Sequence, residues 1–228
     1  MTRPSTPDLA VAANPPPMRG YHDLVRGDVL PHVTARGGTL VDIGGARGGT
    51  ALAARQQGLA DRVGVFDLMA PPAEESDLDF SARVDLEDHE AVAELLETHG
   101  PFDTILTLDI LEHLVDPWRM VELLHSHLKP DGVIVASIPN VQHYSVTWPL
   151  LSRGEWELQD KGVLDRTHLR FFVRTTAVRL MTSSGLAVEA VVGRRSGGRL
   201  ARLIDRVTLG RLSGFFDLQF IVRVRRQR

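Results

Sequence analysis

Apolar residues in this chain occur in short runs separated by segments of helical spacing, and the first run sets the pattern for the rest. Residues 39–43 (TLVDI) are apolar or β-branched except for Asp42, and the glycines that follow end the run, which predicts a buried strand. Residues 50–57 (TALAARQQ) are good helix formers, and Gly58 follows where a left-handed residue would end a helix. A strand that enters a helix through a glycine-rich turn begins a doubly wound sheet, whose ligand lies over the carboxyl ends of the strands.

The same alternation of strand and helix patterns continues along the chain. Residues 68–80 contain two prolines and no clear period, so we expect a loop where a helix is usual. Residues 218–224 alternate as an antiparallel edge strand does. Further strands are expected at 62–67, 81–86, 102–109, 133–138 and 186–192, and helices at 87–99, 117–128 and 175–184. Together these elements predict an α/β, Rossmann-like doubly wound fold with a mainly parallel seven-stranded sheet, one antiparallel edge strand and helices on both faces.

Domain organisation follows from the segments that lack a strand or helix pattern. Residues 1–18 are rich in proline and lack the apolar core of a signal peptide, so we expect a flexible tail. Residues 19–228 are expected to form a single domain, because the 228-residue chain is 43% hydrophobic and can bury one sizeable core. Within that domain, residues 19–35 predict short N-terminal helices, and the weakly periodic residues 140–172 predict a lid or substrate insertion, called the lid segment below.

Composition narrows the class of protein. The chain has no cysteine, which excludes disulfides, thiolate metal sites and a cysteine nucleophile and fits the reducing cytoplasm. No run approaches the roughly 18–20 apolar residues of a membrane span, so we expect a soluble, cytoplasmic protein with no membrane partner. The net charge is −3, but residues 194–228 carry ten arginines against two aspartates. A basic segment can meet nucleic acid, yet these arginines alternate with core-type residues, which favours a solvated edge.

The spacing of the glycine-rich turn selects a ligand. The turn is of the form Asp42-x-Gly44-x-x-x-Gly48. It matches neither the G-x-G-x-x-G of dinucleotide sites nor the lysine-containing phosphate loop. An acid two residues before the first glycine suits a ligand with a cationic ammonium group near a bare turn, as in the methionine moiety of S-adenosylmethionine.

Other acids stand at the predicted ends of neighbouring strands. Asp67 follows Asp42 by about 25 residues, a spacing at which a carboxylate can accept both ribose hydroxyls of an adenosine. Asp85 and Asp109 also end predicted strands. Because the carboxyl ends of parallel strands share one edge of the sheet, these positions are expected to converge on one ligand.

Three stretches resemble the motifs of class I S-adenosylmethionine-dependent methyltransferases. They are LVDIGGARGG at 40–49, ILTLDILEHLVDPW at 105–118 and LLHSHLKPDGVIVASIPN at 123–140. SIPNVQHYSV and GVLDRTHLRFFV further resemble a bacterial subgroup of small methyltransferases, many of them associated with glycan or secondary-metabolite pathways. The resemblance covers roughly residues 20–228 and implies S-adenosylmethionine as cofactor, S-adenosylhomocysteine as product, and methyl transfer to an oxygen or nitrogen of a small-molecule acceptor.

The resemblance also implies which residues hold the cofactor. Phe66 stands where the family often has the ribose acid, and Arg47 stands where glycine is frequent, so that Arg47 can reach the methionine carboxylate or point to solvent. Carried over by position, the turn residues Asp42, Gly44, Gly45, Ala46, Arg47 and Gly48 line the methionine moiety, Asp67 holds the ribose, Asp85 and Leu86 flank the adenine, and Asp109 lies beneath the sulfonium end. Leu68 and Ile110, which follow two of these acids, are also assigned to the cofactor.

Candidates for catalysis and acceptor binding lie in and near the lid segment. His168 is the first candidate for a general base, with Asp165 three residues before it to orient the ring, although a structural histidine is an equally valid interpretation. His143 is the second candidate. Acceptor binding is assigned to Tyr21, Asn140, Tyr144 and Arg166. No metal is expected, because His125 and His127 lie on different helix faces and no acidic ligands cluster in sequence.

Rival functions remain open from the sequence. An enzyme that cyclises or eliminates the aminobutyrate arm of S-adenosylmethionine would carry the same cofactor motifs, and so would a non-catalytic binding protein. A nucleic-acid methyltransferase is disfavoured, because residues 109–112 read DILE where base amino methyltransferases have a DPPY- or NPPF-type tetrapeptide. A homodimer is compatible with the sequence.

Overall fold

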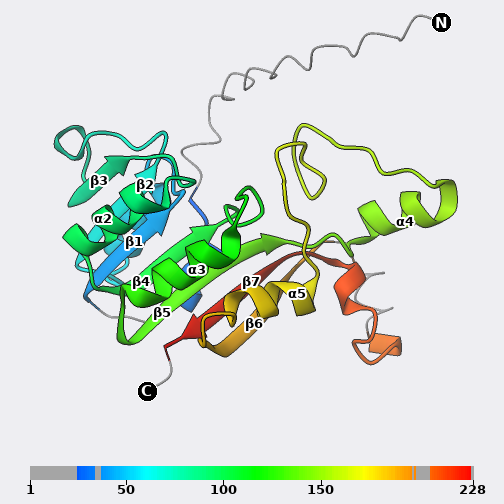
Figure 1. Cartoon of the computed structure of the whole chain (residues 1–228). Coiled ribbons are helices and arrows are strands. Elements are labelled where there is room, and N and C mark those ends of the chain that lie inside the picture. The colour runs from blue at the N-terminus through cyan, green and yellow to red at the C-terminus, as the bar shows by residue number, and fades with distance from the viewer. Residues whose placement is uncertain (1–24, 34–36, 197, 199–205, 227–228) are drawn as a thin grey trace, which may run out of the picture.

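A seven-stranded sheet forms the centre of the protein, in a computed structural model that describes residues 25–33, 37–196, 198 and 206–226 (Figure 1). The strands lie in the order β3-β2-β1-β4-β5-β7-β6. Their bounds are Thr39–Ile43 for β1, Arg62–Asp67 for β2, Phe80–Arg83 for β3, Phe102–Leu108 for β4, Leu128–Pro139 for β5, Ala187–Arg195 for β6 and Asp217–Arg225 for β7.

The direction of the strands confirms the Rossmann-like α/β class. Strands β1 to β5 pair in parallel, and β7 pairs antiparallel with both β5 and β6. The prediction that the antiparallel strand lies at the edge is wrong, because β7 lies between β5 and β6. The alternating pattern of β7 suggested that one face is exposed to solvent. Its charged residue Arg223 is instead buried, and the guanidinium pairs with Glu189 of β6 at 2.6 Å.

Helices cover both faces of the sheet. Asp88 and Asp116 accept hydrogen bonds from Ala91 and Arg119 and so fix the starts of two helices, α2 and α3, the second of which has Pro117 as its first residue. The helices are α1 (Gly49–Gln56), α2 (His89–His99), α3 (Pro117–Ser126), α4 (Tyr144–Arg153) and α5 (Arg174–Met181), with 3-10 turns η1 (Leu30–His32), η2 (Ala73–Glu75) and η3 (Ser213–Phe215).

Two hydrophobic cores hold these layers together. On one face, α2, α3 and α5 bury Leu96, Met120 and Leu180 against the sheet (Figure 1). On the other face, α1 and residues 29–33 bury Ala54 and their neighbours. Burial of apolar surface on both faces is why β1, β2, β4 and β5 are nearly continuous hydrophobic runs.

Several segments differ from their predicted form. The lid segment contains α4, which the sequence did not predict and which has Pro149 inside it. Strand β5 begins at Leu128 and not at residue 133 as expected, because residues 129–132 also belong to the strand, across a register shift in its pairing with β4. The loop at 68–80 is confirmed, with η2 its single helical turn.

The N-terminal predictions are only partly covered by the described residues. Of the helices expected at 19–35, residues 25–33 are described and contain η1, while the tail at 1–18 lies outside. Among the described residues, none of the helices has the length and apolar character needed to cross a membrane.

The contact between Gly64 and Phe80 gives a stability prediction. A Cβ on Gly64 would lie 2.1 Å from the Phe80 ring, which is stacked on His99 at 4.7 Å and has no room to move. We expect Gly64→Ala to lower the free energy of unfolding by about 1–3 kcal/mol in chemical denaturation, as overpacking does. Gly27→Ala is the control, because nothing lies within 4 Å of its added Cβ. Equal stability of the two variants would contradict this account of the β2–β3 contact.

Candidate functional site

Acidic residues gather where the central strands end. Asp67 is the last residue of β2, Asp42 lies near the end of β1, and Asp109 directly follows β4. These three strands are neighbours in the sheet and run in parallel, so the three carboxylates belong to one edge. Three of the four acids predicted to converge therefore lie at one edge of the sheet, and their convergence on one ligand stays a prediction.

Asp42 is the most electrostatically costly of these acids. Its side chain is 1% exposed, and neither carboxylate oxygen has a hydrogen-bond partner in the part of the chain that the structure describes. Burial, reinforced by the charge of Asp67 and opposed by Arg26, raises the pKa of Asp42 to about 7. A buried carboxyl group without a partner suits a site that a cationic ligand completes.

The glycine-rich turn lies directly on this carboxylate. A Cβ on Gly45 would lie 2.5 Å from the Asp42 carboxyl carbon, and one on Gly44 would lie 2.1 Å from Ile110. Gly44 and Gly48 have φ of +75° and +79°, in the left-handed region that favours glycine. The glycines therefore let the backbone pass over Asp42 at close range, and Ile110, two residues after the end of β4, packs against the turn.

Asp67 connects the turn to the end of β2. One carboxylate oxygen accepts from the backbone N–H of Ala46 at 2.9 Å and the other from Met69 at 2.6 Å. Each oxygen keeps a second lone pair for a ligand hydroxyl. The next residue, Leu68, is 59% exposed, which leaves an apolar side chain in water beside this acid.

The remaining cofactor candidates on this side differ in exposure. Asp85 is exposed, and its carboxylate accepts from the Glu87 N–H at 3.0 Å, whereas Leu86 is buried in the core. The side chain of Arg47 lies at the surface. The strand expected at 81–86 ends at Arg83, so Asp85 and Leu86 follow β3 and do not belong to it, and the contacts of all three residues with a ligand stay predictions.

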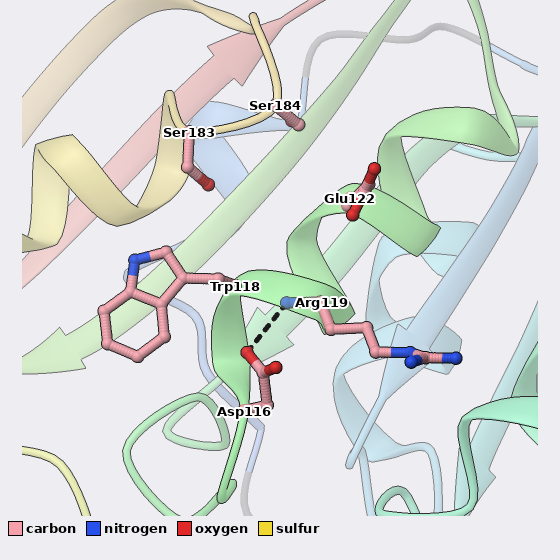
Figure 2. Close-up of a pocket in the computed structure, with 6 residues that line it drawn as sticks. All are labelled: Asp116, Trp118, Arg119, Glu122, Ser183 and Ser184. Atoms are coloured by element: carbon pink, nitrogen blue, oxygen red, sulfur yellow. Dashed lines mark hydrogen bonds between the residues drawn. The ribbon is translucent and has the colours of Figure 1, made fainter.

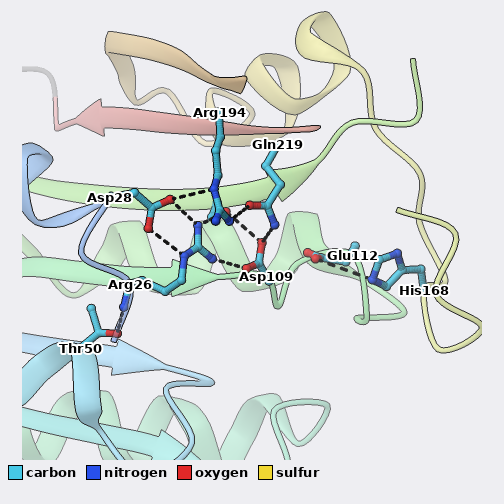
Figure 3. A network of polar contacts seen from close by, with 9 residues as sticks. Arg26, Asp28, Thr50, Asp109, Glu112, His168, Arg194 and Gln219 are labelled. Atoms are coloured by element: carbon cyan, nitrogen blue, oxygen red, sulfur yellow. Dashed lines mark hydrogen bonds and ion pairs between the residues drawn. The ribbon is translucent and has the colours of Figure 1, made fainter. Parts of the chain in front are cut away.

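Asp109 is held in a network that the sequence did not reveal (Figure 3). Its carboxylate pairs with Arg26 and accepts from Ser137 Oγ at 2.9 Å and Gln219 Nε2 at 2.7 Å. Arg26 also pairs with Asp28 at 3.0 Å. These partners come from distant parts of the chain, so no local spacing could identify them. Asp109 is thus compensated by the protein itself, in contrast to Asp42.

Glu112 is a second buried acid without a hydrogen bond, and sequence reasoning passed over it as a site residue. It is 1% exposed, and both carboxylate oxygens lack a hydrogen-bond partner among the residues described. Burial, aided by the charge of Asp109, raises the pKa of Glu112 well above its usual range. His168 Nε2 lies 3.9 Å from Glu112 Oε1 (Figure 3).

The lid segment returns to Glu112 through its backbone. The Glu112 carbonyl accepts from the N–H groups of Leu169 and Arg170 at 2.8 and 3.0 Å. These bonds bring His168 beside the β4–α3 connection, where its ring meets that of His113 edge-on at 4.7 Å. The signal in the sequence that could have identified this arrangement is the pair Glu112-His113, which follows shortly after the strand predicted at 102–109.

Asp165 does not orient the His168 ring. Its carboxylate accepts from the N–H and hydroxyl of Thr167, at 2.9 and 2.7 Å. The two residues are joined through their backbones, by a hydrogen bond from the His168 N–H to the Asp165 carbonyl. Glu112 is the acid that faces the imidazole, so the predicted partner is replaced by a residue 56 positions earlier.

His143 and Asn140 are placed as structural residues. His143 is buried at the start of α4, and its ring nitrogens bond Ser145 Oγ at 2.8 Å and Ser196 Oγ at 2.5 Å. Asn140 is fully buried and donates to the carbonyls of Gly214 and Asp217, both at 2.7 Å. These bonds join the end of β5 to the start of β7.

Two of the other acceptor candidates contact residues of the chain itself. Tyr144, the first residue of α4, is half exposed and packs against the His143 ring at 4.4 Å. Arg166 is exposed and pairs with Asp160 at 2.6 Å. Tyr21 lies outside the described residues.

A surface pocket lies between α3 and the residues after α5 (Figure 2). Its lining includes none of the predicted site residues. The residues around it are Asp116, Trp118, Arg119, Glu122, Ser183 and Ser184. Asp116 is also the cap of α3.

Comparison with known proteins gives a family and a fold. A family model described as a methyltransferase domain matches residues 22–191. A relative named ubiquinone biosynthesis O-methyltransferase, from Caulobacter vibrioides, is 29% identical over 113 residues, which span 45% of this chain and 43% of the relative.

Solved structures are similar over most of the chain. A SAM-dependent methyltransferase from Archaeoglobus fulgidus has a TM-score of 0.59 at 18% identity and covers 87% of this chain and 90% of its own. The N-methyltransferase NodS from Bradyrhizobium japonicum, solved with S-adenosylhomocysteine, has a TM-score of 0.52 at 16% identity and covers 88% and 85%. At these identities the likeness shows the fold.

The raised pKa of Asp42 gives a linkage prediction for S-adenosylhomocysteine. At pH 6.5 the Asp42 carboxyl group is mostly protonated, since its pKa is about 7. The ligand's α-amino group is already cationic there, so an ammonium placed beside Asp42 favours the ionised form and expels a proton. We expect a net release of protons on binding, measured by calorimetry in two buffers of different ionisation enthalpy.

The sign of this linkage fixes the control and the pH dependence. Affinity should rise as pH rises through about 7, because Asp42 is then ionised before the ligand arrives. Asp42→Asn removes the titrating group, so it should release no proton and bind about tenfold more weakly at pH 8. Equal proton release by both proteins would show that Asp42 does not meet the ammonium.

Proposed function

The chain belongs to the methyltransferase domain family, and from that membership we propose that it transfers the methyl group of S-adenosylmethionine to a hydroxyl oxygen of a small molecule. The observation that carries the proposal is the pair of buried, unbonded carboxylates, Asp42 near the end of β1 and Glu112 after its neighbour β4. Asp42 suits a cationic cofactor, and Glu112 lies behind an imidazole at the acceptor side.

S-adenosylmethionine is the cofactor of this chain, and when bound it supplies an electrophilic methyl group on a sulfonium. We assign its ammonium group to Asp42 beneath the turn at 44–48, and its ribose hydroxyls to the second lone pairs of Asp67. The exposed Leu68 supports an adenine contact, because an apolar side chain beside the ribose acid offers a face for the ring.

Activation of the acceptor is assigned to Glu112 and His168. The Nδ1 of His168 lies 3.1 Å from the Val163 carbonyl, a contact in which Nδ1–H donates and Nε2 keeps its lone pair. That lone pair can take up the acceptor's proton directly, or it can coordinate a cation that lowers the pKa of the acceptor hydroxyl. Glu112 stabilises a positive charge that develops at this position, since its oxygens have no other hydrogen-bond partner in the described chain.

Aromatic side chains of the lid segment support a flat or sugar-like acceptor. Trp156 and Phe171 are partly exposed and meet edge-on at 5.4 Å, and Phe171 lies 6.4 Å from the His168 ring. Such rings offer faces to aromatic rings and to the apolar sides of sugars. The acceptor class proposed is therefore a hydroxylated secondary metabolite or sugar-type molecule.

An oxygen acceptor is supported by the name of the Caulobacter relative, an O-methyltransferase, although the match spans 43% of its length. A nucleic-acid substrate has less support. Arginines of the basic C-terminal part pair with acids of the chain itself, which reduces the charge available to phosphates. These pairs are Arg194 with Asp28, Arg195 with Asp217, and Arg223 and Arg225 with Glu189.

The test of this function follows the methyl group. The purified protein is incubated with methyl-labelled S-adenosylmethionine and a metabolite extract of its host, and the label is followed into small molecules, protein and nucleic acid. We expect the label in the small-molecule fraction. Label that enters only protein or nucleic acid, or no transfer at all, would overturn the proposal.

His168→Ala tests the assigned acceptor side. We expect turnover to fall by roughly 10²–10⁴, as for loss of an acid–base group. Affinity for S-adenosylhomocysteine should stay within about twofold, because the cofactor is assigned to other strand ends. His125→Ala, in the last turn of α3, is the matched control and should behave as the parent. Loss of cofactor binding and melting temperature together would instead make His168 a packing residue.

A further inference from the structure

We infer that Glu112, His113 and His168 form a binding site for a divalent transition-metal cation. The site lies where the lid segment returns to the β4–α3 connection. Binding of the cation is independent of the proposed function, and its role in activating an acceptor rests on that function. This inference departs from the sequence-based expectation of no metal, because the ligands converge only in the fold.

The three side chains are close enough to share one ion. Each offers one ligand atom, and these atoms all lie within 4.8 Å of one another. Ligands placed about 2.1 Å from a tetrahedral ion are about 3.4 Å apart. Displacements of the ligand atoms by about 1 Å therefore suffice to close the site. All three residues lie outside helices and strands, so their side chains can make these movements without disturbing an element.

The two imidazoles are oriented as metal-bound histidines are. His168 Nδ1 lies 3.1 Å from the Val163 carbonyl, and His113 Nδ1 lies 3.3 Å from the Thr167 carbonyl. A carbonyl only accepts, so each Nδ1 carries the hydrogen and each Nε2 has a free lone pair. His168 Nε2 and Glu112 Oε1 then face each other at 3.9 Å, two electron-rich atoms that a cation between them would stabilise.

The charge of the surroundings also favours a cation. Both Glu112 oxygens are buried without a side-chain hydrogen-bond partner in the described part of the chain, and only its own backbone N–H and the charge of Arg26 favour its ionised form. Asp109 and Asp165 add negative potential at Glu112, opposed by Arg26. A divalent ion would satisfy the buried carboxylate, whose desolvation otherwise costs several kcal/mol.

The donor set selects the kind of ion. Two imidazole nitrogens and one carboxylate suit Zn²⁺, Fe²⁺, Co²⁺ or Mn²⁺, whereas Ca²⁺ and Mg²⁺ prefer oxygen ligands. Three protein ligands leave a position open for an exchangeable oxygen. An acceptor hydroxyl that coordinated there would have a lowered pKa; its proton would pass to solvent, and the oxygen would keep the electron pair that attacks the methyl carbon. As the oxygen–carbon bond forms, the methyl–sulfur bond breaks, and its electron pair stays on the sulfur of the departing S-adenosylhomocysteine.

Cobalt binding provides the direct test. The full chain, without a histidine tag, is treated with a chelator and titrated with Co²⁺, which is followed by calorimetry and by its visible absorption. We expect one equivalent to bind, with at least tenfold weaker binding in Glu112→Gln and in His168→Ala. His125→Ala is the control and should bind as the parent does. Glu112→Gln keeps the side-chain volume and removes the buried charge, so it retains the fold.

The outcomes separate this inference from the proposed function. Failure to bind Co²⁺ or Zn²⁺, or binding that survives both substitutions, overturns the metal site. Methyl transfer that continues undiminished in the chelated protein overturns the cation's role and leaves the proposed function standing. Stoichiometric binding that depends on Glu112 and His168 supports the metal site even where no acceptor is methylated. The absence of methyl transfer would then count against the proposed function and not against the site.

Discussion

The carboxyl-end edge of this sheet buries two carboxylates, Asp42 and Glu112, that have no hydrogen bond among the described residues, and the free-energy cost of this burial is the constraint on which the site depends. Removing a charged group from water costs several kcal/mol unless it is paired, and both Asp42 and Glu112 are 1% exposed. The two apolar cores on either side of the sheet supply the stability that keeps these groups in place. A cation that arrives at this edge is therefore bound partly through the relief of a cost that folding has already incurred.

Two neighbouring acids, Asp109 and Asp67, are in contrast both hydrogen-bonded, and their bonds hold the edge of the sheet together. Asp109 receives Arg26, Ser137 and Gln219, and Asp67 receives two backbone N–H groups. These compensated acids tie the turn, the segment before β1 and β7 to the same edge. Asp109 and Asp67 thus connect structural elements through their hydrogen bonds, whereas the charges of Asp42 and Glu112 are left for a ligand to neutralise.

The sequence carried the local chemistry and missed the long-range pairings. The strand, turn and helix around Asp42 were predicted because a β-run, left-handed glycines and a helix stop follow one another within 20 residues. The position of β7 was not, because one face of its alternation is an arginine neutralised by Glu189 of another strand. Asp165 was chosen as the partner of His168 for its nearness in sequence, whereas the backbone bonds of the lid segment bring Glu112 to the ring.

The placement of β7 inside the sheet imposes an order of events on synthesis. In the described sheet β6 is hydrogen-bonded to β7 alone, although β6 comes first in the chain. While the ribosome has released residues 187–195 but not 217–225, the outer edge of β5 is unpaired and β6 has no strand to join. Strands β1 to β5 can assemble before that point, so the nascent chain passes through a stage with an open sheet edge, the kind of edge that chaperones protect from pairing with other chains.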